Sequence, residues 1–330
     1  MKFNKHSSRA LILLAASYIS LAGASAASAN ITIATVPVGN VGNAADSTGF
    51  GSVAYSYNIG QYDVTSNQYT AFLNAVATTD TYGVYNSAMA GTTTGNPGII
   101  QSGSPGSYSY SVAAGRGNYP VTDVTFWDTT RFANWLDNGQ PTGAEGPGTT
   151  ETGTYTLTST GIANNTITRN TNYTWAVTSE NEWYKAAYYT PSGGTGNTNP
   201  NYWLYPTQSN TISISQANYY TGAGSGPGSG TDTTPVGSYA DPSYYGTYDE
   251  GGDVDQWNES IYYGSYRGLR GGSFYSNAGK LQSGSFDYGD PSYGNNAVGF
   301  RVSQVPEPAS LGILGLGVIG MLGRRRGVRR

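Results

Sequence analysis

Carboxylates are the side chains of this sequence that could do chemistry. Residues 30–304 hold 19 of the 20 Asp and Glu residues, whereas Cys is absent and the single His, His6, lies near the N-terminus. Disulfides and thiol nucleophiles are therefore excluded, as are thiolate metal sites. Without Cys or His in 30–304, no general base of the usual kind and no copper, zinc or iron site is expected. Two carboxylates alone can hydrolyse glycosides, so a carboxylate-based hydrolase or transferase stays open, although no spacing marks a pair.

The charge of residues 30–304 restricts the partners of this region. It carries eight Lys and Arg residues against 19 Asp and Glu residues, a net charge of −11. Nucleic acids and anionic membrane surfaces attract clustered cations. Neither is therefore expected as a partner, whereas divalent cations and neutral glycans are compatible with this charge.

The N-terminus has the three parts of a secretory signal peptide. Lys2, Lys5 and Arg9 are followed by an apolar stretch, 10–23, and then by small residues that fit two cleavage sites up to residue 29. The apolar stretch is shorter than the roughly 20 residues of a membrane-spanning helix, which makes a permanent anchor the weaker alternative. We expect residues 1–29 to be a signal peptide that exports the chain through the inner membrane.

The C-terminus contains a second three-part signal. Pro306, Glu307 and Pro308 precede an uncharged apolar run, 309–323, and five arginines follow within 305–330. At about 1.5 Å per residue the run spans about 22 Å, a short transmembrane segment whose arginines would stay in the cytoplasm. An ordinary tail anchor is the alternative to a transient one. This order resembles the PEP-CTERM sorting signal, which implies cleavage by an exosortase-type membrane protease and a final place at the cell surface or outside the cell.

Three helices are predicted where a capping box precedes an apolar helical pattern. In a capping box, the N-cap hydroxyl and the side chain three residues later satisfy each other's free backbone N–H groups. The pairs are Thr65 with Gln68, Thr125 with Asp128, and Ser179 with Glu182. The first helix should run to about Val76, and Gly139 should stop the second.

Short strands and long loops are expected between these helices. Strand-like segments are 54–59, 155–158, 171–177, 269–274 and 298–303. Stretches rich in Gly, Ser and Thr at 86–118, 138–172 and 191–234 indicate loops or hairpin insertions. The fold class is therefore an irregular α+β single domain with few helices, short antiparallel strands and long loops.

Seven segments together resemble the formylglycine-generating enzyme family, also called sulfatase-modifying factor domains. In order along the chain they are 57–69, 120–128, 179–187, 235–239, 252–257, 270–274 and 299–302. The resemblance implies a fold related to C-type lectins. The Trp and Tyr residues of these segments are expected in the core, and Arg270 and Arg301 in buried ion pairs, with Asp63 and Glu180 as candidate partners.

The resemblance does not extend to the family's catalytic residues. Family oxidases bind copper with two cysteines, and the matching positions here are Ser276 and Leu281. Neither side chain can bind soft copper(I), so formylglycine-generating activity is not expected. A related branch uses iron held by histidines in a second domain, and this chain has neither feature.

A structural calcium site is also implied by the resemblance. The matching ligands would be Asp249, Gln256 and the carbonyls of Gly252 and Val254. Carboxylate, amide and carbonyl oxygens together suit Ca²⁺, but Gln stands where the family has Glu. A second site could use Asn218 and the Tyr219 carbonyl. A solvated acidic turn is the alternative interpretation.

The sequence favours an exported, non-catalytic surface or matrix protein that binds glycans or proteins. Tyr and Trp can stack on sugar rings, while Asn and Asp bind hydroxyl groups. Two alternatives remain: the carboxylate-based hydrolase or transferase, and a divergent maturation factor for another exported protein.

Overall fold

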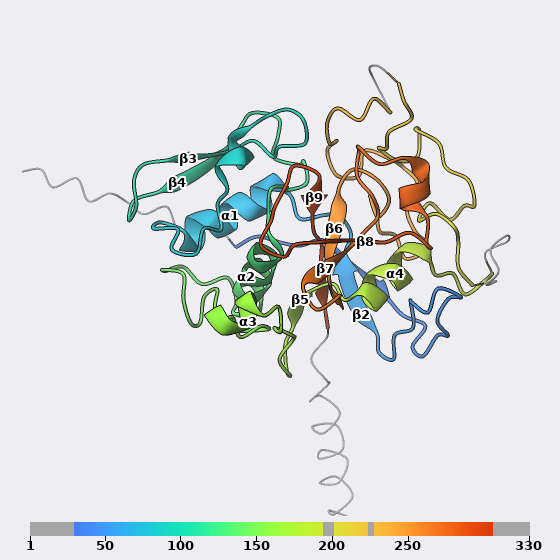
Figure 1. Cartoon of the computed structure of the whole chain (residues 1–330), viewed down its shortest axis with the longest axis horizontal. Coiled ribbons are helices and arrows are strands. Elements are labelled where there is room, and N and C mark those ends of the chain that lie inside the picture. The colour runs from blue at the N-terminus through green and yellow to red at the C-terminus, as the bar shows by residue number, and fades with distance from the viewer. Residues whose placement is uncertain (1–29, 194–200, 224–227, 306–330) are drawn as a thin grey trace, which may run out of the picture.

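The structure is a computed structural model that describes residues 30–193, 201–223 and 228–305. The expected signal peptide, the sorting motif Pro306–Pro308 and the apolar run 309–323 lie outside the described residues. Within the described ranges, no helix is long and apolar enough to cross a membrane. These residues form an α+β fold with short strands and long connections (Figure 1).

One four-stranded sheet joins the two ends of the domain. Its antiparallel order is β1-β2-β10-β5. The strands are β1 (Thr35–Val38), β2 (Tyr57–Gly60), β10 (Val302–Gln304) and β5 (Trp175–Val177). Because β10 pairs with β2 on one side and β5 on the other, the final strand fixes the N-terminal strands to the middle of the chain.

The second sheet has the order β8-β7-β6-β9. Its strands are β8 (Asp287–Gly289), β7 (Tyr266–Arg270), β6 (Asp255–Tyr262) and β9 (Val298–Gly299). The expectation of antiparallel strands is wrong for one pair, because β6 and β9 run parallel. Strands β8 and β9 run in the same direction on opposite edges of the sheet, so the chain crosses over from the β7 side to the β6 side between them.

All three predicted capping boxes are confirmed. They open α1 (Ser66–Val76), α2 (Phe126–Asp137) and α4 (Glu180–Tyr188). In α4, the Glu182 backbone N–H donates to the Ser179 hydroxyl, and the Glu182 carboxylate accepts from the Ser179 N–H. Such an N-cap contributes about 1 kcal/mol to stability, and here it also fixes the direction in which the helix leaves β5.

The main core is aromatic and lies between α1, α2 and the first sheet (Figure 1). The Phe132 ring lies 5.5 Å from Phe72, 5.7 Å from Trp135 and 5.4 Å from Phe300. Each such pair adds about 0.5–1.5 kcal/mol beyond the burial of its area. The expected core positions of the tryptophans in the family segments are confirmed, because Trp127, Trp183 and Trp257 are all buried.

The observed strands differ from all five predicted ones. The segments 54–59 and 171–177 become strands only at Tyr57 and at Trp175. Residues 155–158 form no strand, because Thr158 caps the short helix α3 (Ser159–Ala163). The segment 298–303 is divided into β9 and β10. Strand 269–274 stops at Arg270, because Gly271 and Gly272 have φ angles of 97° and 69°, which glycine tolerates best.

The stretch 86–118, which was expected to be a loop or a hairpin insertion, contains a hairpin. Strands β3 (Ile99–Ser102) and β4 (Ser109–Val112) pair antiparallel. They follow a 3₁₀ helix, η1 (Ser87–Ala90). The hairpin lies beside α1 (Figure 1).

Candidate functional site

The segment after β7 holds the two positions where the resembling family has its cysteines. A short 3₁₀ helix, η2 (Ala278–Leu281), turns this segment back toward Gly272. A Cβ atom on Gly272 would lie 3.0 Å from Leu281 Cδ1 and 3.2 Å from Ser276 Cβ. Glycine is therefore required here both by its φ angle and by the close approach of these two side chains.

Leu281 is part of a small hydrophobic cluster. Its side chain is fully buried and packs with Tyr205, Ala217 and Tyr219. The Ser276 hydroxyl accepts a hydrogen bond from the Ser273 backbone N–H at 3.0 Å. Both positions thus take part in local packing and turn formation.

The surface beside this segment is also closely packed. A depression lined by Gly272, Lys280 and Asp287, among others, has no space for a water molecule. At its rim, Lys280 and Asp287 form an exposed ion pair at 3.2 Å. A substrate could not reach Leu281 through this depression as it stands.

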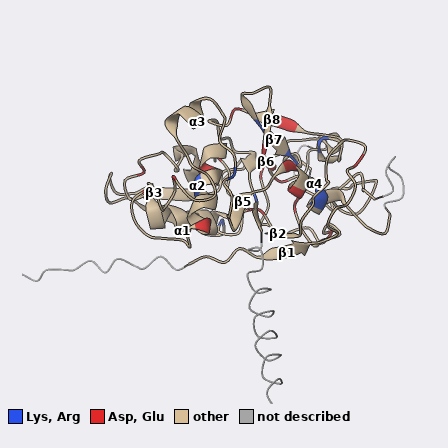
Figure 2. Cartoon of the chain, turned by 90° about the horizontal axis from the view of Figure 1, so that it is seen from below, with Lys and Arg blue, Asp and Glu red and all other residues tan. Residues whose placement is uncertain are grey.

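Arg270 makes the buried ion pair expected from the sequence. Its guanidinium donates to Glu180 from Nε at 2.9 Å and from Nη2 at 2.5 Å. It also donates to the carbonyls of Ser283 and Ser285. Several charged residues gather in this region between α4 and strands β6 to β8 (Figure 2). The pair thus fastens α4 to β7 and to the segment that follows η2.

Arg301 is the other arginine expected in a buried ion pair, and it too has a candidate partner nearby. Its guanidinium lies 3.5 Å from Asp63 and 3.6 Å from Glu250. Its three hydrogen bonds, however, go to the Gly60 and Tyr248 carbonyls and to Gln256. The two carboxyl groups therefore lie close to its charge without hydrogen-bonding to it directly.

Buried carboxylates near Arg301 are poorly solvated. Burial raises the pKa of Asp63 well above its usual range, and it raises the pKa of Glu250 and of Asp253 to about 7. Both Asp63 oxygens and the Asp253 Oδ2 atom are buried without a hydrogen-bond partner in the described structure. At neutral pH this cluster therefore holds protons that exposed carboxylates would lose.

In the first implied calcium set, the Gln256 side chain lies beside the Asp249 backbone, and its polar atoms have protein partners. The Gln256 side-chain oxygen accepts from Trp183 at 2.6 Å and from Arg301 at 2.8 Å. Its amide nitrogen donates to the Asp249 carbonyl at 2.9 Å. Gly252 is held beside Gly271 by a backbone hydrogen bond, and Val254 is buried. Gln256 would have to release the Arg301 guanidinium before it could bind a cation.

The second implied set lies near the first. The Asn218 amide nitrogen donates to the Asp253 carboxylate, and the Asn218 carbonyl accepts from the Asp253 N–H, both at 2.8 Å. Tyr219 is buried beside Leu281. In the described parts of the chain, no group of three or more His, Cys, Asp or Glu residues is arranged to hold a metal. Calcium binding stays a prediction.

The chain belongs to the family of the sulfatase-modifying factor enzyme 1-like domain, whose model matches residues 27–305. Residues 304–326 match the PEP-CTERM protein-sorting motif. This motif indicates export and C-terminal sorting to the cell envelope, and it implies recognition by an exosortase. A comparison with curated proteins finds no match.

Two solved structures confirm the fold. CarF is similar with a TM-score of 0.51 and 20% identity, over 84% of this chain and 99% of its own. Treponema denticola variable protein 1 has the same TM-score and identity, over 84% of this chain and 97% of its own. PvdO from Pseudomonas aeruginosa gives a TM-score of 0.47 at 18% identity, over 83% of this chain and 92% of its own. At this identity the likeness concerns the fold alone.

Proposed function

We propose that this chain is an exported, non-catalytic component of the cell surface or the extracellular matrix that acts by binding. It keeps the scaffold of its family, while the two positions that match the copper ligands serve packing and turn formation. The single observation that carries the proposal is the complete burial of Leu281 against Tyr205, Ala217 and Tyr219. A hydrocarbon side chain held in this way can neither bind copper nor leave room for a peptide thiol.

An oxidase assay tests the proposal. The full-length chain, solubilised in detergent, is incubated with a sulfatase-type cysteine peptide, oxygen and copper(I), and the peptide mass is followed. We expect an unchanged peptide. Conversion of the cysteine to formylglycine would overturn the proposal and would favour the alternative, a divergent maturation factor for another exported protein. A known formylglycine-generating enzyme run in parallel shows that the assay works.

The carboxylate-based hydrolase receives little support from the described residues. Such an enzyme needs two carboxyl groups at a substrate site, roughly 5–10 Å apart. Most acids of the described chain are instead buried or half-buried, and among them Glu180, Glu182 and Glu151 pair with arginines. The exposed acids are Asp241, Asp287 and Asp290. A screen with chromogenic glycosides would detect this activity, and we expect none.

Calcium would act as a structural ion in this proposal. If it binds, the melting temperature of the EDTA-treated protein should rise on addition of millimolar calcium and fall again with EDTA, because a ligand that binds only the folded state stabilises it. An unchanged melting temperature would contradict calcium binding and leave the proposed function intact.

A further inference from the structure

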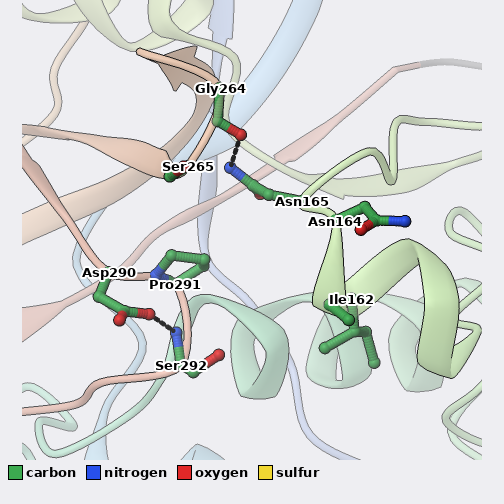
Figure 3. Close-up of a pocket in the computed structure, with 9 residues that line it drawn as sticks. Ile162, Asn164, Asn165, Gly264, Ser265, Asp290, Pro291 and Ser292 are labelled. Atoms are coloured by element: carbon green, nitrogen blue, oxygen red, sulfur yellow. Dashed lines mark hydrogen bonds between the residues drawn. The ribbon is translucent and has the colours of Figure 1, made fainter.

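A polar cavity lies on the surface at the end of α3, away from the segment 271–281. Its volume is about 500 Å³, within the range of roughly 300–1,000 Å³ that is usual for ligand sites. Three segments line it: residues 162–165 at the C-terminal end of α3, the β6–β7 turn at 264–265, and residues 290–292 after β8. Figure 3 shows these segments around the cavity, which we call the α3 pocket.

The α3 pocket offers hydrogen-bonding groups that the protein does not use. Across the described ranges, the amide of Asn164 and the hydroxyls of Ser265 and Ser292 have no side-chain hydrogen bond. The Asp290 carboxylate accepts from the Ser292 N–H at 2.9 Å (Figure 3) and can accept further bonds. Donors and acceptors of this kind suit a ligand rich in hydroxyl groups.

The wall of the α3 pocket is fixed by a buried arginine. Arg267 donates to the Asn165 side-chain oxygen at 2.6 Å and to the Ile167 carbonyl at 2.7 Å. Its guanidinium also lies over the Phe126 ring at 4.3 Å. Asn165 in turn bonds the Gly264 carbonyl at 3.5 Å (Figure 3). A wall held in place before a ligand binds lowers the entropy that binding costs.

Three exposed tyrosines lie within two residues of pocket-lining residues in the chain. We call Tyr263, Tyr266 and Tyr288 the tyrosine strip. Tyr263 and Tyr266 flank the turn at 264–265, and Tyr288 precedes Asp290 by two residues. The Tyr288 ring lies 5.3 Å from that of Tyr263 and 5.1 Å from that of Tyr266. Tyr263 is 78% exposed. Exposed apolar surface gathered beside a cavity is typical of a binding site.

We propose that the α3 pocket and the tyrosine strip form a binding site for a neutral oligosaccharide. Sugar rings present C–H groups that pack on aromatic faces, while their hydroxyls would bond Asn164, Ser265, Ser292 and Asp290. The net charge of −11 over residues 30–304 and the carboxylate in the pocket repel acidic glycans. Among the described residues, Asp290 is the only acid that lines the pocket, so the site binds its ligand without the carboxylate pair that hydrolysis requires.

This site deepens the proposed function and rests on it. A protein of the envelope or matrix would meet neutral polysaccharides, and this pocket names the residues that would hold them. Because a single carboxylate lines the pocket, binding is independent of divalent cations. This property distinguishes the site from one in which calcium holds the sugar.

A glycan-binding experiment tests the site. The full-length chain in detergent is applied in EDTA to an array of neutral hexose oligosaccharides and uronic-acid oligosaccharides. Titration calorimetry with the best neutral oligosaccharide follows. We expect neutral oligosaccharides to bind in EDTA and uronic acids not to bind. Tyr263→Ala and Asn164→Ala should each weaken binding about tenfold or more, whereas Tyr244→Ala, which removes a 44% exposed tyrosine elsewhere, should leave it unchanged.

The outcomes separate this site from the proposed function. Absence of neutral-glycan binding, binding only of uronic acids, binding that EDTA abolishes, or equal loss in the Tyr263 and Tyr244 variants would each overturn the site. If the cysteine peptide also stays unchanged in the oxidase assay, the non-catalytic proposal survives. Far-UV circular dichroism and the melting temperature of each variant show that a loss of binding does not reflect unfolding.

Discussion

The region around Arg270 and Leu281 differs from the α3 pocket in almost every physical respect. The first is buried, closely packed and rich in ion pairs, and it lies in segments that resemble the family. The second is open and lined by polar side chains, with exposed tyrosines close to its lining residues in the chain. The comparison indicates that the family motifs of this chain hold the scaffold together. The polar groups available for a ligand lie in the α3 pocket, which no family motif marks.

The largest effect is expected from the buried ion pair. Arg270→Met leaves the Glu180 carboxylate buried at the start of α4 without its cation, which should cost roughly 3–5 kcal/mol of the free energy of unfolding. Urea denaturation measures it. The double variant Arg270→Met with Glu180→Leu removes both charges, so it should be more stable than the single variant. Equal stability of the single variant and the wild type would break the contrast between the two regions.

A somewhat smaller effect is expected at Leu281. Leu281→Ala leaves a cavity among Tyr205, Ala217 and Tyr219, and such cavities cost roughly 2–5 kcal/mol. The matched control Leu281→Met keeps the volume and should cost less than about 1.5 kcal/mol. A Leu281→Ala protein as stable as the wild type would mean that this position is not closed.

The acidic cluster predicts a pH dependence of stability. Because burial raises the pKa of Asp253 to about 7, the folded state keeps a proton that the unfolded chain loses near pH 4. This contribution to stability is therefore complete below about pH 4 and is lost as the pH rises toward 7. Glu250 acts in the same direction.

Denaturation in EDTA from pH 4.5 to 8 measures this effect. Asp253→Asn should flatten the decline by about 1 kcal/mol or more, whereas Asp241→Asn, at an exposed acid, should not change it. Over this window Glu182 does not interfere. Its burial raises its pKa, but Arg169 outweighs burial and lowers that pKa to about 2. A stability that rises from pH 5 to 8 would contradict the buried, protonated state of Asp253.

The smallest effect on stability is expected in the α3 pocket. Asn164 is exposed and follows α3, so Asn164→Ala should change the free energy of unfolding by less than about 0.5 kcal/mol. The same variant should lose glycan binding. A large loss of stability would show that the pocket is part of the scaffold and would remove the contrast.

Much of the scaffold could be predicted because its signals are local. A capping box needs two residues at a fixed spacing, so Thr125 with Asp128 marked the start of α2 correctly. The partners of Arg270 and Arg301 followed from the family segments. The strand expected at 155–158 was wrong because tertiary bonds decide this segment. The Tyr155 hydroxyl donates to Glu259 and accepts from the Val177 N–H. The backbone N–H of Tyr155 donates to the Asn134 side chain.

The α3 pocket could not be predicted in this way. About 100 residues separate its first segment, 162–165, from the second, 264–265, and about 25 residues separate the second from the third, 290–292. No sequence motif links the three segments. Their proximity depends on Arg267, which reaches from β7 to Asn165 and Ile167. The nearest signal in the sequence was the cluster of tyrosines around the Gly264–Ser265 turn. This cluster indicates a binding surface only once the structure shows that β8, with Tyr288, pairs with β7.

Hydrogen–deuterium exchange with and without the best neutral oligosaccharide tests the central claim most directly. It maps where a ligand meets the full-length chain, whichever region that is. We predict slower exchange in peptides that cover 162–165, 262–266 and 288–293, with no change in 272–283. Protection confined to 272–283 would place the ligand at the closely packed segment around Leu281 and would contradict a binding site at the α3 pocket.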